Sequence, residues 1–142
     1  MNKFLSSKNT LTIAILWLLV VLLTTVMVLN FQNNYIPLFP FIILSLVIGL
    51  LIWILLDTRY VIKNNNLLYR SGPFRGRIDI TKINKIKNHS GLYVPVLMKP
   101  ALDTKGFIIT YNKFDEVFIS PRKADVFLQE ILKINSQIEV TS

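Results

Sequence analysis

The residues of this chain that could carry chemistry are mostly basic, and they gather in one stretch. Nine lysines and arginines but a single acid lie between Arg59 and Lys99, whereas five bases and six acids follow that stretch. Clustered bases attract phosphate groups, on an anionic membrane surface or on a nucleic acid. The candidate contacts with lipid headgroups or the membrane surface are Arg59, Lys63, Arg70, Arg75, Arg77, Lys82 and Lys85.

The role of these bases stays open between three hypotheses. Arg70, Arg75 and Arg77 bracket a Gly-Pro turn and could converge on one phosphate. The stretch could instead attract anionic lipid without selecting a headgroup, at about 1 kcal/mol for each base near the surface. It could also serve only to keep its part of the chain in the cytoplasm, which is compatible with either role.

Groups that could catalyse a reaction are sparse. The only adjacent acids, Asp115 and Glu116, lie beside an expected turn, where carboxylates are solvated rather than held in a cleft. His89 has no acidic neighbour in the sequence, and the chain has no cysteine, no glycine-rich phosphate loop and no nucleophile elbow. We therefore expect no enzyme, no catalytic residue, no cofactor and no metal site.

Two apolar runs precede the basic stretch. Residues 9–56 contain no acid, base or histidine, which no soluble domain of this size would tolerate. As helices, residues 11–29 and 36–56 each reach roughly 30 Å, the thickness of the hydrocarbon core of a bilayer. The first run is too long for a signal peptide and lacks a small-residue cleavage site. We expect a transmembrane helical hairpin over residues 1–57.

The distribution of bases around the hairpin predicts its orientation. Lys3 and Lys8 precede the first run and the basic stretch follows the second, whereas the connecting residues 30–35 carry no base. Basic flanks remain in the cytoplasm, so both termini should be cytoplasmic. We expect a multi-pass protein of a bacterial inner membrane.

The remaining residues, 58–142, show short alternations of apolar and polar residues broken by turn signals, a pattern typical of strands. Hairpins are expected over residues 59–70 and 107–120, with a further strand at 77–80.

A helix should end the chain, with Ser120 as its N-cap and Pro121 at its first position. The spacing predicts one continuous apolar face. Its members are Ala124, Phe127, Leu128, Ile131 and Leu132.

Several of these motifs together resemble the YyaB-like bacterial PH domain family. They are Tyr60-Val-Ile-Lys-Asn, the turn Arg70-Ser-Gly-Pro-Phe74, Ile109-Thr-Tyr111 and Val117-Phe-Ile-Ser-Pro121. The resemblance implies an α+β fold, in which a transmembrane hairpin is followed by a PH-like, bent antiparallel β-roll capped by the C-terminal helix.

The resemblance also implies a function, a non-catalytic binding module at the cytoplasmic membrane face. We expect it to recognise a membrane or cytoplasmic protein partner, with non-specific support from anionic lipid and no binding to nucleic acid. Phe74 and Phe114, at expected turn tips, are candidate interface contacts, and packing onto the sheet is the alternative for both. The alternative function is immunity, self-protection against a membrane-active bacteriocin, because a related protein confers it.

Overall fold

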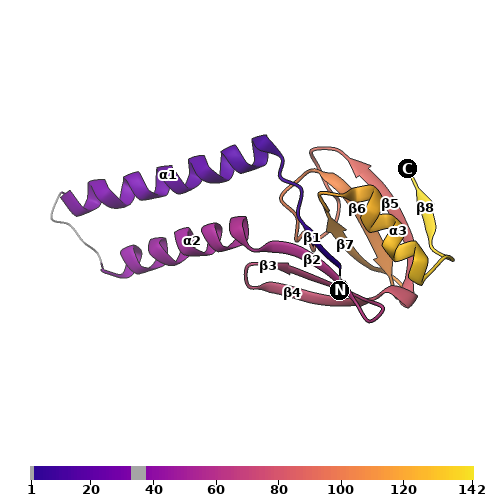
Figure 1. Ribbon diagram of the computed structural model, residues 1–142. Helices are drawn as coiled ribbons and strands as arrows, with labels where there is room; N and C mark the ends of the chain where they lie inside the picture. The colour runs from indigo at the N-terminus through magenta and orange to yellow at the C-terminus, as the bar shows by residue number, and fades with distance from the viewer. Residues whose placement is uncertain (1, 33–37) are drawn as a thin grey trace.

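Two long helices form a hairpin near the start of the chain, of which the computed structural model describes residues 2–32 and 38–142. Helix α1 (Thr10–Gln32) and helix α2 (Leu38–Leu56) project side by side from a β-rich domain (Figure 1). Both are long and apolar enough to cross a membrane, judged by length and composition. The two expected helices are confirmed, and the expected start of the second, at residue 36, lies outside the described residues.

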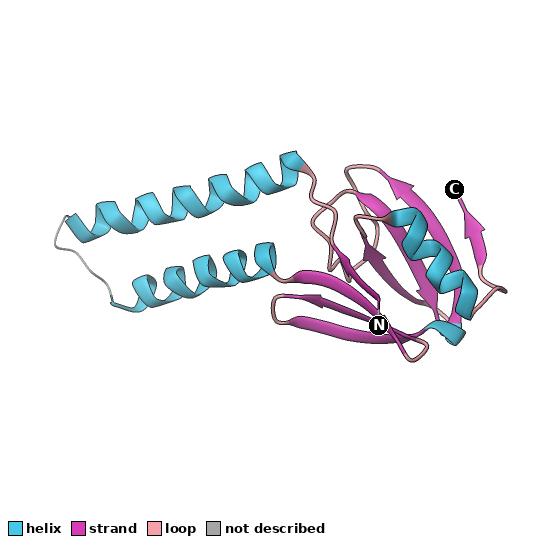
Figure 2. Cartoon of the chain, viewed as in Figure 1, coloured by secondary structure: helices cyan, strands magenta, loops and turns pink. Residues whose placement is uncertain are grey.

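Two four-stranded sheets make up the domain (Figure 2). The first has the order β1-β2-β3-β4 and is antiparallel; the second has the order β7-β6-β5-β8, with β8 parallel to β5. A 3-10 helix at Ile80–Lys82 turns the chain from the first sheet into the second, and helix α3 (Ala124–Ile134) covers them. The strands are β1 (Asn2–Leu5), β2 (Thr58–Lys63), β3 (Asn66–Ser71), β4 (Phe74–Asp79), β5 (Ile83–Ser90), β6 (Lys105–Tyr111), β7 (Asp115–Ile119) and β8 (Glu139–Thr141).

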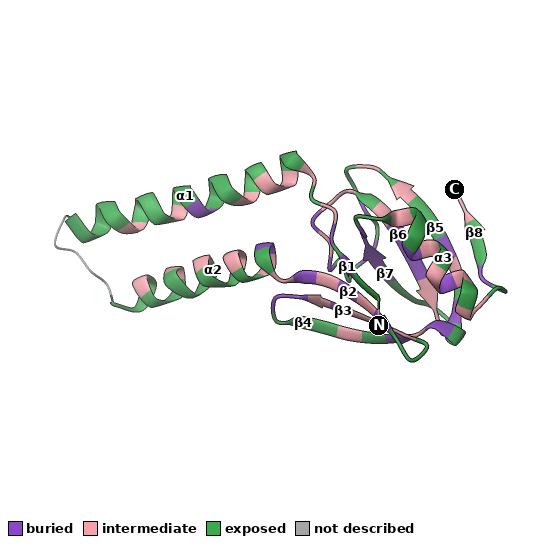
Figure 3. Ribbon diagram, viewed as in Figure 1, coloured by how far each residue is buried: buried purple, intermediate pink, exposed green. Residues whose placement is uncertain are grey.

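The core of the domain lies where the two sheets meet α3, and Figure 3 shows the buried residues gathered there. The ring of Phe127 on α3 is fully buried, with its centroid 5.2 Å from that of Phe4 edge-on and 6.3 Å from that of Phe107 in a stack. Ile131 is buried one turn later, and the rest of the predicted apolar face packs against the same cluster. The expected α+β, PH-like fold is confirmed.

The start of the C-terminal helix differs from the sequence prediction. Helix α3 begins at Ala124, and its N-cap is Lys123 rather than Ser120. Ser120 is buried, its backbone N–H donates to the Tyr60 hydroxyl oxygen at 3.1 Å, and its own hydroxyl lies 3.0 Å from that of Ser6. Ser120 therefore serves the packing of the domain, and the cap prediction was wrong because these tertiary partners outweigh a local helix start.

The strand β1 comes from residues that precede the hairpin. It pairs antiparallel with β2, with Phe4 opposite Tyr60, so the domain expected at residues 58–142 also contains Asn2–Leu5. The chain leaves this strand, forms α1 and α2, and returns to the same sheet as β2. The helical hairpin is thus an insertion between two neighbouring strands of one sheet.

A buried polar network fastens the segment before α1 to the domain. The Tyr60 hydroxyl donates to the backbone carbonyl of Pro100 at 2.6 Å, and the Ser6 hydroxyl oxygen accepts from the backbone N–H of Leu102 at 3.2 Å. Burial raises the pKa of the Tyr60 hydroxyl above its ordinary value, against opposing hydrogen bonds with Ser120 and Ser6. The hydroxyl therefore keeps its proton and acts as a donor at neutral pH.

Asp103 makes the attachment of the segment before α1 to the domain depend on pH. Burial alone would raise the pKa of its carboxyl, but hydrogen bonds from the Ser7 hydroxyl and from the backbone N–H groups of Lys105 and Thr104 hold the pKa below its ordinary value of 3.8. A lowered native pKa means that the carboxylate stabilises the folded state above that value, and that this contribution is lost as the pH falls through the native pKa.

We expect Asp103→Asn to lower the free energy of unfolding of the full chain at neutral pH. The difference from the wild type should disappear as the pH falls below about 4. Urea denaturation in detergent at a series of pH values measures it. Ser7→Ala, which removes one donor and keeps the carboxylate, should lose part of the same stabilisation. If the free energies of unfolding of Asp103→Asn and the wild type differ by the same amount down to acid pH, the carboxylate does not stabilise the fold.

Candidate membrane-surface site

Three arginines form a row across the outer face of the first sheet. Arg59 on β2 lies opposite Arg70 on β3, which in turn lies opposite Arg75 on β4. Directly opposed residues of neighbouring strands project from the same face, with Cβ atoms about 5 Å apart. The fold therefore gathers three guanidinium groups that the sequence separates; we call them the arginine row.

Further bases extend this row into a basic face. Lys63 and Arg77 lie farther along β2 and β4 on the same side of the sheet, and Lys3 joins them through β1, opposite Val61. A groove of about 430 Å³ lies over this surface, and its lining around Val61 and Leu68 includes Lys3, Arg59, Lys63, Arg70 and Arg75. The basic face consists of Lys3, Arg59, Lys63, Arg70, Arg75 and Arg77.

Acidic partners neutralise only part of this charge. Asp57 contacts the guanidinium groups of both Arg59, at 3.5 Å, and Arg70, at 2.5 Å. Arg77 donates from Nε to the amide oxygen of Asn66 at 2.9 Å, and Arg75 forms no ion pair with any described residue. Three like charges beside one carboxylate repel each other, so an anion bound over the row would relieve that repulsion.

The arginine row lies at the end of the domain next to the helices. The turn between β3 and β4 packs against the last turn of α2, since a Cβ on Gly72 would lie 2.9 Å from Cγ1 of Ile54. Gly72 has φ +56°, a left-handed conformation that suits glycine. Phe74, which follows this turn, is 54% exposed. This end of the basic face is therefore level with the cytoplasmic end expected for α2.

The structure separates the other predicted contacts from this face. Lys82 lies in the 3-10 helix, and Lys85 on β5 pairs with Glu139 at 3.2 Å. Phe114 is 90% exposed, but Asn112, two residues before it, donates from its backbone N–H to the carbonyl of Lys82, at the end of the domain away from the helices. Both aromatic tips are exposed, Phe114 more than Phe74, and only Phe74 lies beside the hairpin.

The predicted group of three arginines around the Gly-Pro turn is rearranged. Arg70 and Arg75 do face each other across the turn, whereas Arg77 lies opposite Leu68, two residues farther from it. Arg59 takes the third place in the row, and Lys3 belongs to the basic face although it precedes the hairpin. The hairpin expected over residues 59–70 already contained Arg59, whereas no local signal indicated Lys3.

The residues considered for catalysis lie apart from one another. His89 lies in β5, and its ring and that of Phe118 meet in a T-shaped arrangement with 5.9 Å between centroids. Asp115 accepts a hydrogen bond from the Asn112 side chain at 2.8 Å within an exposed turn. Within residues 2–32 and 38–142, no three His, Asp or Glu side chains are grouped closely enough to hold a metal ion.

Comparison with known proteins agrees with this architecture. A family model described as "Bacterial PH domain" matches residues 58–135, more than half of the chain. The chain belongs to the bacterial PH domain family. PH domains are in general non-catalytic binding modules, and here the module is joined to two helices that could span a membrane. The protein is a membrane-associated binding module.

A curated relative supports the YyaB-like assignment within this bacterial PH domain family. The "Uncharacterized protein YyaB" of Bacillus subtilis (strain 168) is 28% identical over 100 residues, which cover 69% of this chain. The chain spans 66% of that relative, just under two thirds of its length. No solved structure matches the chain.

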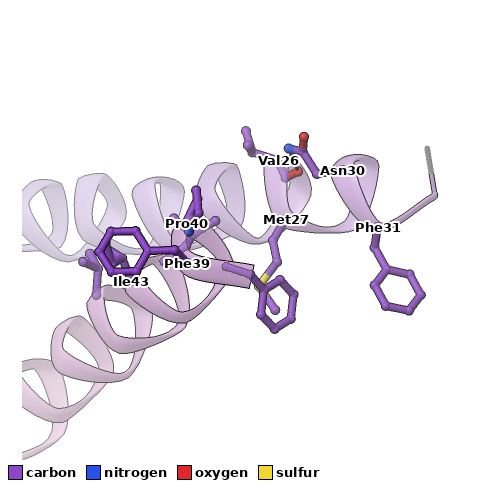
Figure 4. A pocket seen from close by; sticks show the side chains of 10 residues that line it. Val26, Met27, Asn30, Phe31, Phe39, Pro40 and Ile43 are labelled. Carbon is purple, nitrogen blue, oxygen red and sulfur yellow. Dashed lines mark hydrogen bonds between the residues drawn. The ribbon is translucent and has the colours of Figure 1, made fainter. Parts of the chain in front are cut away.

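A second hollow, of about 470 Å³, lies between the two helices at the end of the hairpin away from the domain (Figure 4). Its wall is apolar except for Asn30, whose side-chain amide donates to the backbone carbonyl of Val26 at 2.7 Å. The described lining contains no titratable group, so it offers apolar contact and no acid–base chemistry.

Proposed function

We propose that this chain is a multi-pass protein of a bacterial inner membrane, with both termini in the cytoplasm, whose PH-like domain binds a protein partner at the membrane surface. The basic face attracts anionic headgroups and orients the domain. The observation that supports this proposal most directly is the arginine row beside the end of α2. The pairing of β1 with β2 supports a common side for the segments that precede α1 and follow α2.

The attraction to lipid is electrostatic rather than selective. Each base within a Debye length of an anionic leaflet contributes about 1 kcal/mol, so the arginine row supplies at most roughly 3 kcal/mol. Asp57 already pairs with two of the three guanidinium groups of the row, those of Arg59 and Arg70. Such a surface orients a tethered domain without distinguishing one anionic headgroup from another.

The partner-binding surface in this proposal is the outer edge of β4. It is the last strand of the first sheet and begins with the exposed Phe74 beside the hairpin. An unpaired edge can accept an extended segment of another protein through backbone hydrogen bonds. A domain held at the bilayer is badly placed to bind nucleic acid. Immunity against a bacteriocin stays a prediction of the family resemblance.

Hydrogen exchange of the full chain in nanodiscs tests the orientation by lipid. Backbone amides of β4 should exchange more slowly in discs containing phosphatidylglycerol than in neutral discs, and high salt should abolish the difference. The variant Arg59→Gln/Arg70→Gln/Arg75→Gln should lose the difference, since up to roughly 3 kcal/mol corresponds to roughly a hundredfold in the equilibrium constant.

The matched control removes the same charge elsewhere. Lys82→Gln/Lys85→Gln/Lys87→Gln lies off the basic face and should retain most of the protection of β4. Equal losses in the two triple variants would show that net charge alone matters and would contradict the proposed role of the face. Photo-cross-linking in cells from position 74, compared with position 114, then tests for the protein partner.

A further inference from the structure

The loop between β5 and β6 exposes large apolar side chains that the proposed function does not use. Leu92 is 86% exposed, Tyr93 is 78% exposed, and Leu97 is fully exposed, with Met98 beside it. Single exposed apolar residues are ordinary on protein surfaces, but several on one short loop mark an interaction site. Residues 91–99 are called the 91–99 loop below.

The same loop is anchored so that these side chains must point outward. Val94 and Val96 are buried against Ile108 and Phe118 of the second sheet. The carbonyl of Met98 accepts a hydrogen bond from the backbone N–H of Phe118 at 3.0 Å. With the inward positions filled by the two valines, the leucines on either side of them remain exposed, so their exposure follows from a fixed conformation of the loop.

The loop continues directly into the segment fastened to α1. Leu102 accepts from the backbone N–H of Asn9 at 3.2 Å, one residue before α1 begins at Thr10. With 23 residues, α1 extends to about 34 Å, slightly more than the hydrocarbon thickness of about 30 Å, so its first turn belongs at the headgroups. Figure 2 shows the β5–β6 connection on the side of the domain that faces the helices.

One further contact suits a position at the headgroups. The Lys99 ammonium lies 5.6 Å from the centroid of the Tyr93 ring. Tyrosine and lysine are both enriched where a protein crosses from lipid to water, because each combines an apolar body with a polar end. A lipid surface satisfies both the apolar tips and this pair.

We propose that the 91–99 loop inserts Leu92 and Leu97 into the headgroup–acyl boundary next to α1, as an apolar membrane contact of the PH-like domain. The inference rests on the proposed function, since it requires that α1 spans the bilayer. This contact lies beside the start of α1, whereas the arginine row lies beside the end of α2. The two contacts also have different physical bases. Apolar insertion needs no anionic lipid and withstands salt, unlike the contact of the basic face.

The absence of cysteine from the sequence allows a direct test. Single cysteines at Leu97, Phe114 and Leu18, in separate full-length variants, are labelled with a polarity-sensitive NBD fluorophore. All three side chains are exposed, so labelling leaves the packing of the fold unchanged. The variants are reconstituted into phosphatidylcholine vesicles with and without lipids that carry a nitroxide quencher on the acyl chain.

The label at position 97 should emit at shorter wavelength than the label at 114 and be quenched by the nitroxide, at both low and high salt. In the Leu97→Cys background, Leu92→Ser should reduce that quenching toward the level at position 114. A label at 97 that matches 114, while the label at 18 is quenched, would overturn the inference and leave the proposed function standing. An unquenched label at 18 would overturn both, because α1 would then not cross the bilayer.

Discussion

Replacing Phe4 by alanine should destabilise the PH-like domain by about 3–5 kcal/mol, although this residue lies in the short segment before the first helix. Phe4 is 7% exposed, and its ring meets Phe127 edge-on at the centre of the core. Truncation would leave a cavity between β1, β2 and α3 that the fixed strands could fill only in part. Urea denaturation of the full chain in a mild detergent, read by limited proteolysis of the domain, measures the loss.

The neighbouring residue provides the control. Leu5 lies in the same strand but projects from the other face and is exposed, so Leu5→Ala should change the free energy of unfolding by no more than about 0.5 kcal/mol. Equal effects of the two substitutions would contradict the assignment of β1 to the domain. If Phe4→Ala behaves as expected, a fragment that begins at residue 58, where the family match begins, lacks a strand and part of its core.

The elements that the sequence predicted are those with local signals. Alternating residues on either side of Lys63-Asn-Asn-Asn66 predicted the β2–β3 hairpin, and Asn64 and Asn65 adopt the positive φ values, 49° and 60°, that asparagine tolerates in such turns. Apolar residues three and four positions apart predicted α3 and its buried face. Each of these signals is contained within a few consecutive residues.

The elements that the sequence did not predict depend on distant partners. β1 is four residues long and meets β2 only after the whole hairpin has intervened, and β8 is a three-residue strand parallel to β5. Neither is long enough to show a periodicity of its own. Ser120 has the chemistry of an N-cap, but Tyr60 and Ser6 hold it in the core, and neither is near it in the sequence.

The candidate site was predicted only in part, because some of its residues are brought together by local turns and others by distant strand pairing. Arg70 and Arg75 face each other across a tight turn, and the sequence indicates that pair. Arg59 enters the row through the register between β2 and β3, and Lys3 through the unforeseen β1. The placement of Lys82 and Phe114 at the far end of the domain follows from the path of β4, which carries the chain away from the hairpin.

Replacing Gly106 by alanine should weaken the pairing of β6 with β7 by roughly 3 kcal/mol, the upper part of the range for overpacking. A Cβ at Gly106 would overlap the carbonyl oxygen of Ile119, and a backbone atom in a paired strand has little room to move. Since β7 leads into Ser120 and the buried network, the shift would also loosen the segment before α1.

Gly91→Ala is the matched control, because its Cβ would make only an ordinary contact, 3.4 Å from the His89 ring. Thermal unfolding of both variants in detergent should show a large loss for Gly106→Ala and almost none for Gly91→Ala, and similar curves would mean that the close approach of β6 to β7 is not required for the fold.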